Sequence, residues 1–474
     1  MKPARNVIQN HHLGLDLGTT SVKAVIWDSE NQHCECEAVE ATGAKVPHKD
    51  PLFDEQSVTL ILNAVQRCIA RLPAVQLRNV ESVGVSGQMH GVVFWSSKNG
   101  TCCYDQGKYS VVESKVSNLV TWQDGRCTEE FLRTLPVSKS HVGVSSGFGC
   151  ATIFWLQQNS PQSLSGYDCA GTIQDFLVAV ICGLEKPVMT TQNAASWGYF
   201  DTASSCWEVD ALKDAGFPLL FLPEVEEPRF KAGRLKETWC GVPAGTSVGA
   251  AFGDMQCAVH SVLSYSRDRN EKNAVLNFST SAQLSFVMKP DFKPIVEGNG
   301  SQPIQYWPYF GKTYLAVAAS LNGGNVLAKW IAMFSEVFKL VGVPVADDTL
   351  WQVLTRAAAG DDALNTNSTA SPLLFGERHL PASRGSISNL GPDGFSASGV
   401  TRALCRGLVS NLLAMMPVKF LRASGVQGIL GTGSALIKNQ ALRDEVGLQF
   451  ELPFVLRQSG DAAVGAAKAI SEHP

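Results

Sequence analysis

Apolar and polar side chains alternate near the start of the chain with the period of a β-strand. Val22, Ala24 and Ile26 share one face of this strand, because successive side chains point to opposite sides. A second apolar run, residues 13–17, precedes it, and residues 18–21 between the two runs are one glycine and three hydroxyl residues. The pattern predicts two strands joined by a short, hydroxyl-rich turn.

The same arrangement returns past the middle of the chain, where residues 274–287 read as strand, hydroxyl-rich turn and strand. The glycine-rich run 245–254 closes the first half, so we expect two domains, 1–250 and 251–474. Strands that alternate with helices predict an α/β fold. Helical spacing and unbroken apolar runs predict helices over 54–72, 151–158, 324–338, 401–416 and 440–446, and strands over 80–86 and from 428.

The first turn has the residue types that hold phosphate. Gly18 lacks a Cβ, so backbone N–H groups and the neighbouring hydroxyls can converge on phosphate oxygens. Asp16, just before the turn, can hold a hydrated Mg²⁺, and Lys23 can direct its charge toward a transferred phosphoryl group. One such turn is more often an ordinary hairpin, whereas two in one chain favour nucleotide binding. The hydroxyls are those of Thr19, Thr20 and Ser21.

A candidate general base lies at the expected domain boundary. Asp254 follows a glycine and can approach a substrate hydroxyl closely. The strand predicted over 80–86 ends in the polar turn Gln88-Met89-His90, and α/β folds present substrate groups at such strand ends. Trp122 and Asp124 offer an aromatic face and a carboxylate, which suit a sugar.

Composition narrows the class of protein. With 45% hydrophobic and 17% charged residues, the chain of 474 residues has enough apolar material for a globular fold. A formal net charge of -4 gives no electrostatic reason to expect nucleic acid or an anionic membrane as partner. The 13 cysteines show no Cys-x-x-Cys repeat, and no apolar run reaches about 18 residues. We therefore expect a cytoplasmic monomer or homodimer with small-molecule partners.

Neither a Walker motif nor a dinucleotide fingerprint occurs, so the two hydroxyl-rich turns are the nucleotide-binding signal. Their pairing resembles the superfamily of sugar kinases, Hsp70 and actin. From Gly14 to about Ile470 the chain resembles the FGGY family of carbohydrate kinases. The motifs that carry this resemblance are Asp16–Lys23, Ser86–Gly91, Gly253-Asp254 and Phe375–Arg378. Longer runs, 120–127, 147–156 and 192–200, are more similar to members that phosphorylate sedoheptulose than to those that phosphorylate xylulose.

The resemblance implies the two-domain actin-like ATPase (ribonuclease H-like) fold, in which duplicated α/β lobes flank a central cleft. It implies ATP and Mg²⁺ as cofactors and transfer of phosphate to the terminal primary hydroxyl of a ketose, with D-sedoheptulose ahead of xylulose. Met89 and His90 lie where ketose kinases bind their sugar, whereas glycerol kinases have an Arg-Glu pair there. Asp254 would be the catalytic base, and Asp16 and Asp254 would hold the metal.

The same resemblance implies which residues contact each substrate. The first phosphate motif would comprise Asp16, Gly18, Thr19, Thr20, Ser21 and Lys23. The second phosphate motif and the adenosine motif would comprise Ser279, Thr280, Ser281, Gly323, Gly324, Gly431, Thr432, Gly433, Ser434 and Asn439. The ketose would contact Gln88, Met89, His90, Trp122, Asp124 and Asp254.

Three positions depart from the family pattern. Thr190-Thr191 stands where many members have Ser-Asp or Thr-Asp, and Arg406 stands where many have glutamate. The run Asn322–Asn325 also differs from the usual small residues. These departures concern the finer sugar contacts and the adenosine pocket, and they leave Asp254 untouched.

Two further classes of function stay open from sequence alone. An actin-like or Hsp70-like ATPase would move a partner protein, but the chain shows no separate peptide-binding or polymerising segment. A kinase relic could act as a sugar sensor, but Asp254 is retained together with both phosphate turns.

Overall fold

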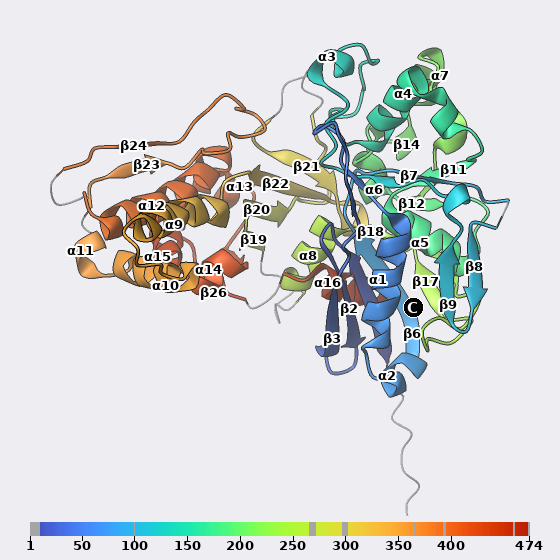
Figure 1. Cartoon of the computed structure of the whole chain (residues 1–474), viewed down its shortest axis with the longest axis horizontal. Coiled ribbons are helices and arrows are strands. Elements are labelled where there is room, and N and C mark those ends of the chain that lie inside the picture. Colours follow the sequence, from blue (N-terminus) through green and yellow to red (C-terminus); the bar gives the residue numbers. More distant parts are fainter. Residues whose placement is uncertain are drawn as a thin grey trace, which may run out of the picture.

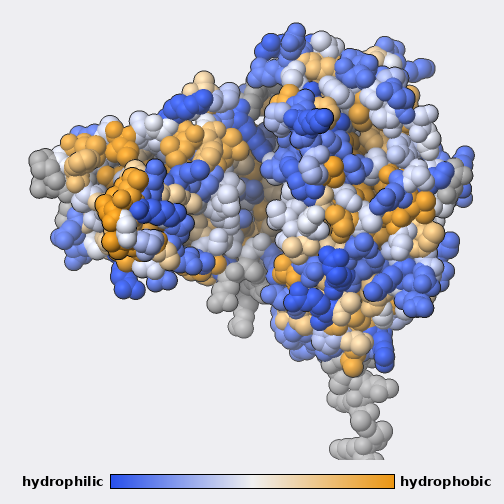
Figure 2. Space-filling model, viewed as in Figure 1, coloured by the Kyte–Doolittle hydropathy of each residue, from blue (hydrophilic) through white to orange (hydrophobic). Residues whose placement is uncertain are grey.

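The computed structural model has two lobes side by side (Figure 1): one is coloured blue to green and also holds the red helix α16 (Ala462–Ser471), and the other is coloured yellow to red. A recess separates the lobes in the space-filling view (Figure 2). The structure describes residues 10–98, 100–264, 272–295, 302–364, 366–391, 395–457 and 460–472.

A seven-stranded sheet forms the centre of the first lobe. Its order is β16-β17-β6-β1-β2-β3, and β18 also pairs with β6. Leu13, Leu15 and Leu17 of β1 are buried opposite the alternating face of β2, so the pattern seen in the sequence is the core face of this hairpin. The strands are β1 (His11–Leu17), β2 (Ser21–Asp28), β3 (His33–Ala41), β6 (Val80–Gly87), β16 (Lys231–Arg234), β17 (Ser247–Gly249) and β18 (Phe252–Gly253).

A six-stranded sheet forms the centre of the second lobe, in the order β21-β22-β20-β19-β25-β26. The hydroxyl-rich turn predicted past the middle of the chain joins β19 to β20. The strands are β19 (Asn273–Phe278), β20 (Ala282–Val287), β21 (Gln305–Pro308), β22 (Tyr314–Ser320), β25 (Gly428–Thr432) and β26 (Phe454–Leu456).

The two sheets repeat one topology. The series β3-β2-β1-β6-β17 and β22-β20-β19-β25-β26 both begin with three antiparallel neighbours and end with two strands parallel to the third. In both, the hydroxyl-rich turn joins the second and third strands of the series. The expected duplication of α/β lobes is thus confirmed.

Helices cover both sheets. The five predicted helices are confirmed as α1, α4, α9, α12 and α15, with shifted ends. The helices that matter below are α1 (Val58–Ala70), α4 (Gly149–Asn159), α5 (Ile173–Cys182), α6 (Thr191–Ala195), α8 (Asp254–Leu263), α9 (Gly324–Leu340), α10 (Asp347–Ala358), α12 (Ala397–Met415), α14 (Ser434–Lys438), α15 (Gln440–Phe450) and α16 (Ala462–Ser471).

The remaining elements are short. The strands are β4 (Lys45–Val46), β5 (Glu55–Gln56), β7 (Val93–Trp95), β8 (Cys102–Asp105), β9 (Lys108–Val111), β10 (Leu119–Val120), β11 (Cys169–Gly171), β12 (Val188–Thr190), β13 (Phe200–Asp201), β14 (Cys206–Trp207), β15 (Glu224–Glu226), β23 (Thr369–Ser371) and β24 (Ser386–Ser388). The helices are α2 (Ala74–Arg78), α3 (Glu129–Leu132), α7 (Val209–Asp214), α11 (Asp361–Leu364) and α13 (Val418–Ala423).

The last helix, α16, packs on the sheet of the first lobe (Figure 1). A Cβ on Gly14 of β1 would lie 2.0 Å from the carbonyl oxygen of Ala463, and one on Gly84 of β6 would lie 2.3 Å from that of Ala466. Gly465 of α16 meets α8 just as closely. No side chain fits at these contacts. Helix α16 can therefore pack this closely on the first lobe's sheet only because glycines lie there. The division into 1–250 and 251–474 stays a prediction.

Candidate active site

The start of α8 places Asp254 beside the turn that follows β6. Gly253 pairs in parallel register with Gly87, the last residue of β6. A Cβ on Gly253 would lie 2.8 Å from the sulfur of Met89, so the two segments are in close contact. The Oδ1 atom of Asp254 accepts a hydrogen bond of 2.7 Å from the Met255 N–H. Burial raises the pKa of Asp254 to about 6, which suits a group that takes up a proton near neutral pH.

Asp16 lies at the end of β1, next to β6. Its parallel register partner is Ser86, whose hydroxyl lies 3.3 Å from Asp16 Oδ1. Burial, and then the negative charges of Asp254 and Asp461, raise the pKa of Asp16 to about 7. The site therefore gathers carboxylates that oppose one another's ionisation.

The third carboxylate, that of Asp461, went unpredicted. It caps α16, because its Oδ1 accepts hydrogen bonds from the N–H groups of Ala463 and Val464. Its Oδ2 lies 2.5 Å from the ammonium of Lys23, which also lies 2.7 Å from Glu37. The ammonium of Lys23 is thus held by two carboxylates, and its predicted role toward phosphate stays a prediction.

The first hydroxyl-rich turn is held by hydrogen bonds from three other segments. The indole N–H of Trp122 donates to Thr19 Oγ1 at 3.1 Å, and Gln56 Nε2 donates to the Thr19 carbonyl at 2.8 Å. The amide N–H of Thr42 donates to the Thr20 carbonyl. Trp122, expected to pack on the sugar, thus contacts the phosphate turn, and a sugar contact stays a prediction.

The second hydroxyl-rich turn is held by the start of α9. The N–H groups of Gly324 and Asn325 donate to the carbonyls of Ser279 and Thr280, at 2.8 and 3.0 Å. A Cβ on Gly323 would lie 2.5 Å from the backbone of Ser281, so glycine is required for this approach.

The predicted adenosine motif lies against the same turn. Gly433 has a φ of 98° and packs on the Phe278 carbonyl, where a Cβ would lie 2.3 Å away. It is followed by Ser434, the first residue of α14. Gly431 packs on the ring of Phe454, and buried Asn439 caps α15 through the Leu442 N–H. Gly431 and Asn439 thus shape the local fold, and their contact with adenosine stays a prediction.

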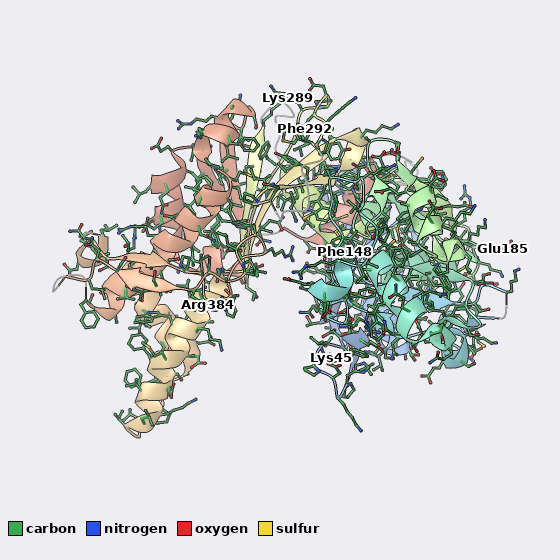
Figure 3. All side chains as sticks on the ribbon, turned by 90° about the horizontal axis from the view of Figure 1, so that it is seen from above. Lys45, Phe148, Glu185, Lys289, Phe292 and Arg384 are labelled. Atoms are coloured by element: carbon green, nitrogen blue, oxygen red, sulfur yellow. The ribbon has the colours of Figure 1, made fainter. Side chains whose placement is uncertain are left out.

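His90 has the geometry of a neutral hydrogen-bond acceptor. Its Nδ1 lies 3.0 Å from the carbonyl oxygen of Ser196, which can only accept, so Nδ1 carries the proton. Burial lowers the pKa of His90 to about 4, so Nε2 stays unprotonated. The imidazole stacks on Phe148 at 4.6 Å between ring centroids, and Trp307 meets it edge-on at 5.8 Å. Figure 3 places Phe148 at the side of the first lobe that faces the second.

Two other predicted sugar-binding residues are occupied by protein contacts. The side chain of Gln88 is buried and donates to Gln56 Oε1 at 3.0 Å. Both carboxylate oxygens of Asp124 accept from Arg126, and Oδ2 also accepts from the Asp54 N–H. Asp124 therefore orders its own loop, and its contact with a sugar stays a prediction.

The chain is similar to known proteins over most of its length. The model of the FGGY family of carbohydrate kinases, N-terminal domain, matches residues 11–260. Over 465 residues the chain is 46% identical to a sedoheptulokinase from Homo sapiens, and the match covers 96% of both chains. The chain belongs to the FGGY family of carbohydrate kinases. It is thus a sugar kinase, and the family implies ATP as phosphoryl donor and a sugar as acceptor.

Other relatives and solved structures agree with this assignment. A sedoheptulokinase from Mus musculus is 45% identical, with 96% of both chains covered. The structure of a xylulose kinase from Rhodospirillum rubrum matches with a TM-score of 0.79 at 18% identity, over 97% of this chain and 89% of that one. A Plasmodium falciparum glycerol kinase with ADP matches with a TM-score of 0.75 at 16% identity, over the same shares. The two structures show that the FGGY kinase fold is shared.

The structure accounts for two departures from the FGGY pattern. Arg406 donates to the Thr366 carbonyl at 2.9 Å and lies 3.5 Å from Glu445, a carboxylate that α15 supplies to this helix interface. Asn322 donates to Glu377 Oε1 and to the Gly376 carbonyl, so the sequence Phe375–Arg378 holds the entry to α9. Both departures are integrated into local hydrogen-bond networks.

Residues of α6 position the segment before Asp254 in this FGGY kinase. Gln192 Oε1 accepts from the Gly253 N–H at 3.1 Å, and Asn193 Nδ2 donates to the Ala251 carbonyl at 3.1 Å. Thr190, one of the departing residues, donates to the same carbonyl at 2.8 Å. Sequence reasoning noted residues 192–200 as a motif but missed this role.

Among helices of the described residues, none has the length and apolarity to cross a bilayer.

Replacing Asp16 by asparagine should stabilise the ligand-free protein at neutral pH. The folded-state pKa of about 7 lies above the usual 3.8, so between these values the folded state binds more protons than the unfolded state. The contribution of the Asp16 carboxyl group to the stability of the folded state is therefore present at low pH and is lost as the pH rises toward 7. Chemical denaturation at pH 5 and pH 8, without nucleotide or metal, should show a smaller loss of stability for Asp16→Asn than for the wild type.

Asp201→Asn is the control, for which we expect the opposite change in stability at neutral pH. Although burial opposes it, hydrogen bonds from Ser204 and from backbone N–H groups lower the pKa of Asp201, so removing its charge should cost stability at neutral pH. If Asp16→Asn kept the wild-type pH dependence, the carboxyl of Asp16 would not have a raised pKa in the folded protein.

Proposed function

We propose that the chain is a sedoheptulokinase, which transfers the γ-phosphoryl group of ATP to the terminal primary hydroxyl of D-sedoheptulose and gives sedoheptulose 7-phosphate. The observation that supports this is the 46% identity to the human sedoheptulokinase across 96% of both chains. The xylulose kinase of Escherichia coli is 24% identical over 202 residues, 41% of this chain. Xylulose is therefore the distant alternative substrate.

Asp254 is suited to act as the general base. It stands at the start of α8, beside the Met89 turn and within electrostatic reach of Asp16. A sugar hydroxyl is far too weak an acid to lose its proton to a carboxylate in advance. The proton would therefore pass to Asp254 as the phosphoryl group arrives, in an in-line transition state.

The carboxylates of Asp16 and Asp254 are suitable ligands for Mg²⁺. Burial, and after it the charges of Asp254 and Asp461, raise the pKa of Asp16, and a divalent cation would offset both by stabilising the carboxylate. Mg²⁺ favours one or two carboxylates together with phosphate oxygens and water. Asp16 and Asp254 would hold the ion, because Asp461 is already paired with Lys23. The bound ion would neutralise negative charge on the phosphates.

The two hydroxyl-rich turns would bind the phosphates of ATP from opposite lobes. Thr19, Thr20 and Ser21 would contact them from the first lobe, and Ser279–Ser281 from the second. Gly433 and Ser434, which follow the second lobe's β25, would lie along the adenosine. The topology repeated in the two lobes supports this arrangement, because it gives each lobe one such turn.

The sugar would bind on the His90 side of Asp254. The unprotonated Nε2 of His90 can accept a hydrogen bond from a sugar hydroxyl. Phe148 and Trp307, which flank His90, also line a cavity of about 910 Å³ formed by both lobes. A longer ketose would extend from His90 toward this cavity, which is lined from residues 129–148, Tyr199 and residues 292–307.

We also propose a reducing, cytoplasmic location. None of the 13 cysteines forms a disulfide in the described part of the chain, which is the usual state in that compartment.

A coupled ADP-release assay across sedoheptulose, xylulose, ribulose and glycerol should give the highest kcat/KM with sedoheptulose. We expect at least a tenfold preference over xylulose, because a shorter sugar leaves polar groups of the site without partners. A preference for xylulose would make the chain a xylulokinase. ADP release at full rate without any sugar would instead support an actin-like ATPase.

Asp254→Asn should lower kcat by about 10²-fold or more, which is the scale of losing a general base, with little change in ATP affinity. ATP affinity measured by calorimetry and kcat from the same assay separate the two effects. Near-normal turnover would remove Asp254 from the proton transfer.

His90→Ala should raise the KM for the ketose much more than the KM for ATP. The lost hydrogen bond is worth roughly 1 kcal/mol, and the stranded sugar hydroxyl adds to the cost. His12→Ala is a matched control, because His12 is a buried histidine whose two ring nitrogens contact Ser82 and Ser29. It should lower the melting temperature and leave both KM values unchanged. An unchanged sugar KM in His90→Ala would show that His90 does not contact the substrate.

A further inference from the structure

Titratable side chains gather at the end of the first hairpin that lies opposite the phosphate turn. His11 is the first residue of β1 and pairs with Asp28, the last residue of β2, which in turn pairs with His33, the first residue of β3. Register partners point to the same face of a sheet, so the three side chains form a row across three strands. Glu35 is left out of the pairing at a bulge in β3.

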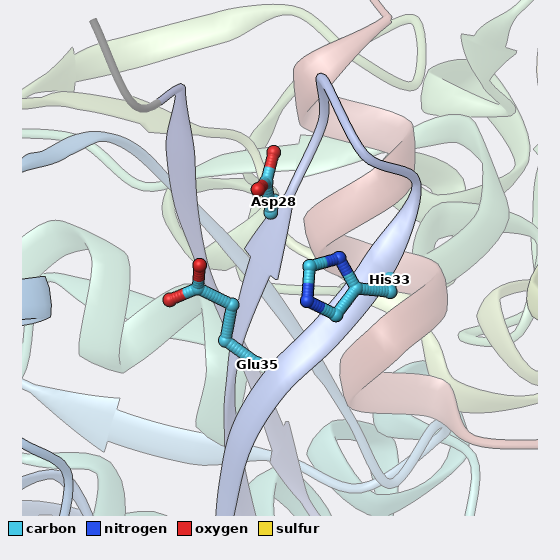
Figure 4. A group of neighbouring side chains, drawn as sticks. All are labelled: Asp28, His33 and Glu35. Carbon is cyan, nitrogen blue, oxygen red and sulfur yellow. The ribbon is translucent and has the colours of Figure 1, made fainter. Parts of the chain in front are cut away.

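The side chains of Asp28, His33 and Glu35 turn toward one another beside the link between β2 and β3 (Figure 4). One ligand atom from each lies within 4.8 Å of the others. Such a cluster alone is common at protein surfaces, so a second observation is needed to indicate a ligand.

The buried histidine behind the cluster supplies that observation. His11 is 0% exposed, yet among the residues that the structure describes neither of its ring nitrogens has a hydrogen-bond partner. Its Nε2 lies 3.2 Å from Glu35 Oε2 without the geometry of a hydrogen bond. The next residue, His12, is also buried and has partners at both nitrogens. A buried imidazole without hydrogen bonds is costly, unless a group absent from the protein chain completes it.

We propose that His11, Asp28, His33 and Glu35 form a site for a divalent transition-metal ion of the zinc type. Ligands about 2.0–2.1 Å from a tetrahedral Zn²⁺ lie roughly 3.3 Å from one another, which is close to the separation of His11 Nε2 and Glu35 Oε2. Two imidazoles and two carboxylates suit zinc, whereas Mg²⁺ and Ca²⁺ favour oxygen ligands throughout.

Asp28 and His33, the other two proposed ligands, differ in how firmly their side chains are held. The carboxylate of Asp28 is fixed by the turn, because Oδ1 accepts from the Glu30 and Asn31 N–H groups and Oδ2 accepts from Asn31 Nδ2 at 2.6 Å. One lone pair of Oδ2 stays free for a metal. His33 is exposed and its side chain makes no hydrogen bond within the described chain, so its ring is free to adjust and close the set.

The ion would tie β1 to the β2–β3 hairpin and would not take part in phosphoryl transfer. Asp16 lies five positions after His11 along β1, which is about 17 Å in a strand. The site is therefore independent of the proposed catalytic Mg²⁺. Its loss would leave the proposed kinase chemistry intact.

The test is Zn²⁺ binding to the full-length, tag-free protein in the presence of excess Mg²⁺, followed by calorimetry. We expect a single tight site in the wild type and at least tenfold weaker binding in His33→Ala and in Glu35→Gln, the usual scale of disrupting a metal site. His48→Ala removes another exposed histidine, outside the cluster, and should bind as the wild type does. Zn²⁺ should also raise the melting temperature of the wild type and of His48→Ala, but not of the other two variants.

Co²⁺ in place of Zn²⁺ distinguishes this site from the cysteines. Binding through nitrogen and oxygen gives d–d absorption without a thiolate charge-transfer band, and it should survive alkylation of the thiols. Equal affinity in all four proteins, a thiolate band, or loss of binding on alkylation would each overturn the proposal. Both cluster variants change partly or fully exposed side chains, and circular dichroism confirms that they fold.

Discussion

Backbone contact between the C-terminal helix and the first sheet is the constraint on which the site depends. Helix α16 can lie against β1 and β6 only because Gly14 and Gly84 have no side chain, and it can lie against α8 only because of Gly465. This packing brings Asp461 to Lys23 and sets α8 beneath the end of β6. Carboxylates from the start, the middle and the end of the chain are thereby concentrated at one place.

That concentration of charge is unfavourable in the ligand-free protein. Burial and like charges raise the pKa of Asp16 to about 7, so stability is lost as the pH rises toward neutrality. Groups that would bind a cation and phosphates are expected to conflict with stability before their ligands arrive. The ion pair of Lys23 with Asp461 limits the conflict, because it neutralises one of the three carboxylates.

Much of the fold could be predicted because its signals are local. The alternation around Val22 specifies the core face of β2, and the helical spacing of residues 324–338 specifies α9. Contacts between distant segments leave no such pattern. Nothing near Asp461 in the sequence indicates that it pairs with Lys23, and nothing near Asp124 shows that Arg126 and Asp54 occupy its carboxylate. Such pairings follow from packing, which a local pattern does not encode.

The two lobes share one topology but differ in how they hold the turn between their hairpin strands. In the first lobe, side chains of Trp122 and Gln56 hold the turn, and the neighbouring strand ends carry carboxylates. In the second lobe, the N–H groups at the start of α9 hold the turn through its own carbonyls, and Gly323 allows the close approach. A helix start carries partial positive charge, which favours nearby anions. In the proposed reaction the first lobe would thus supply the metal-binding carboxylates and the base, while the second would supply a positive environment for phosphate. The repeated topology gives each lobe one such turn, and in the proposed reaction the different neighbours of the two turns would give each its own electrostatic character.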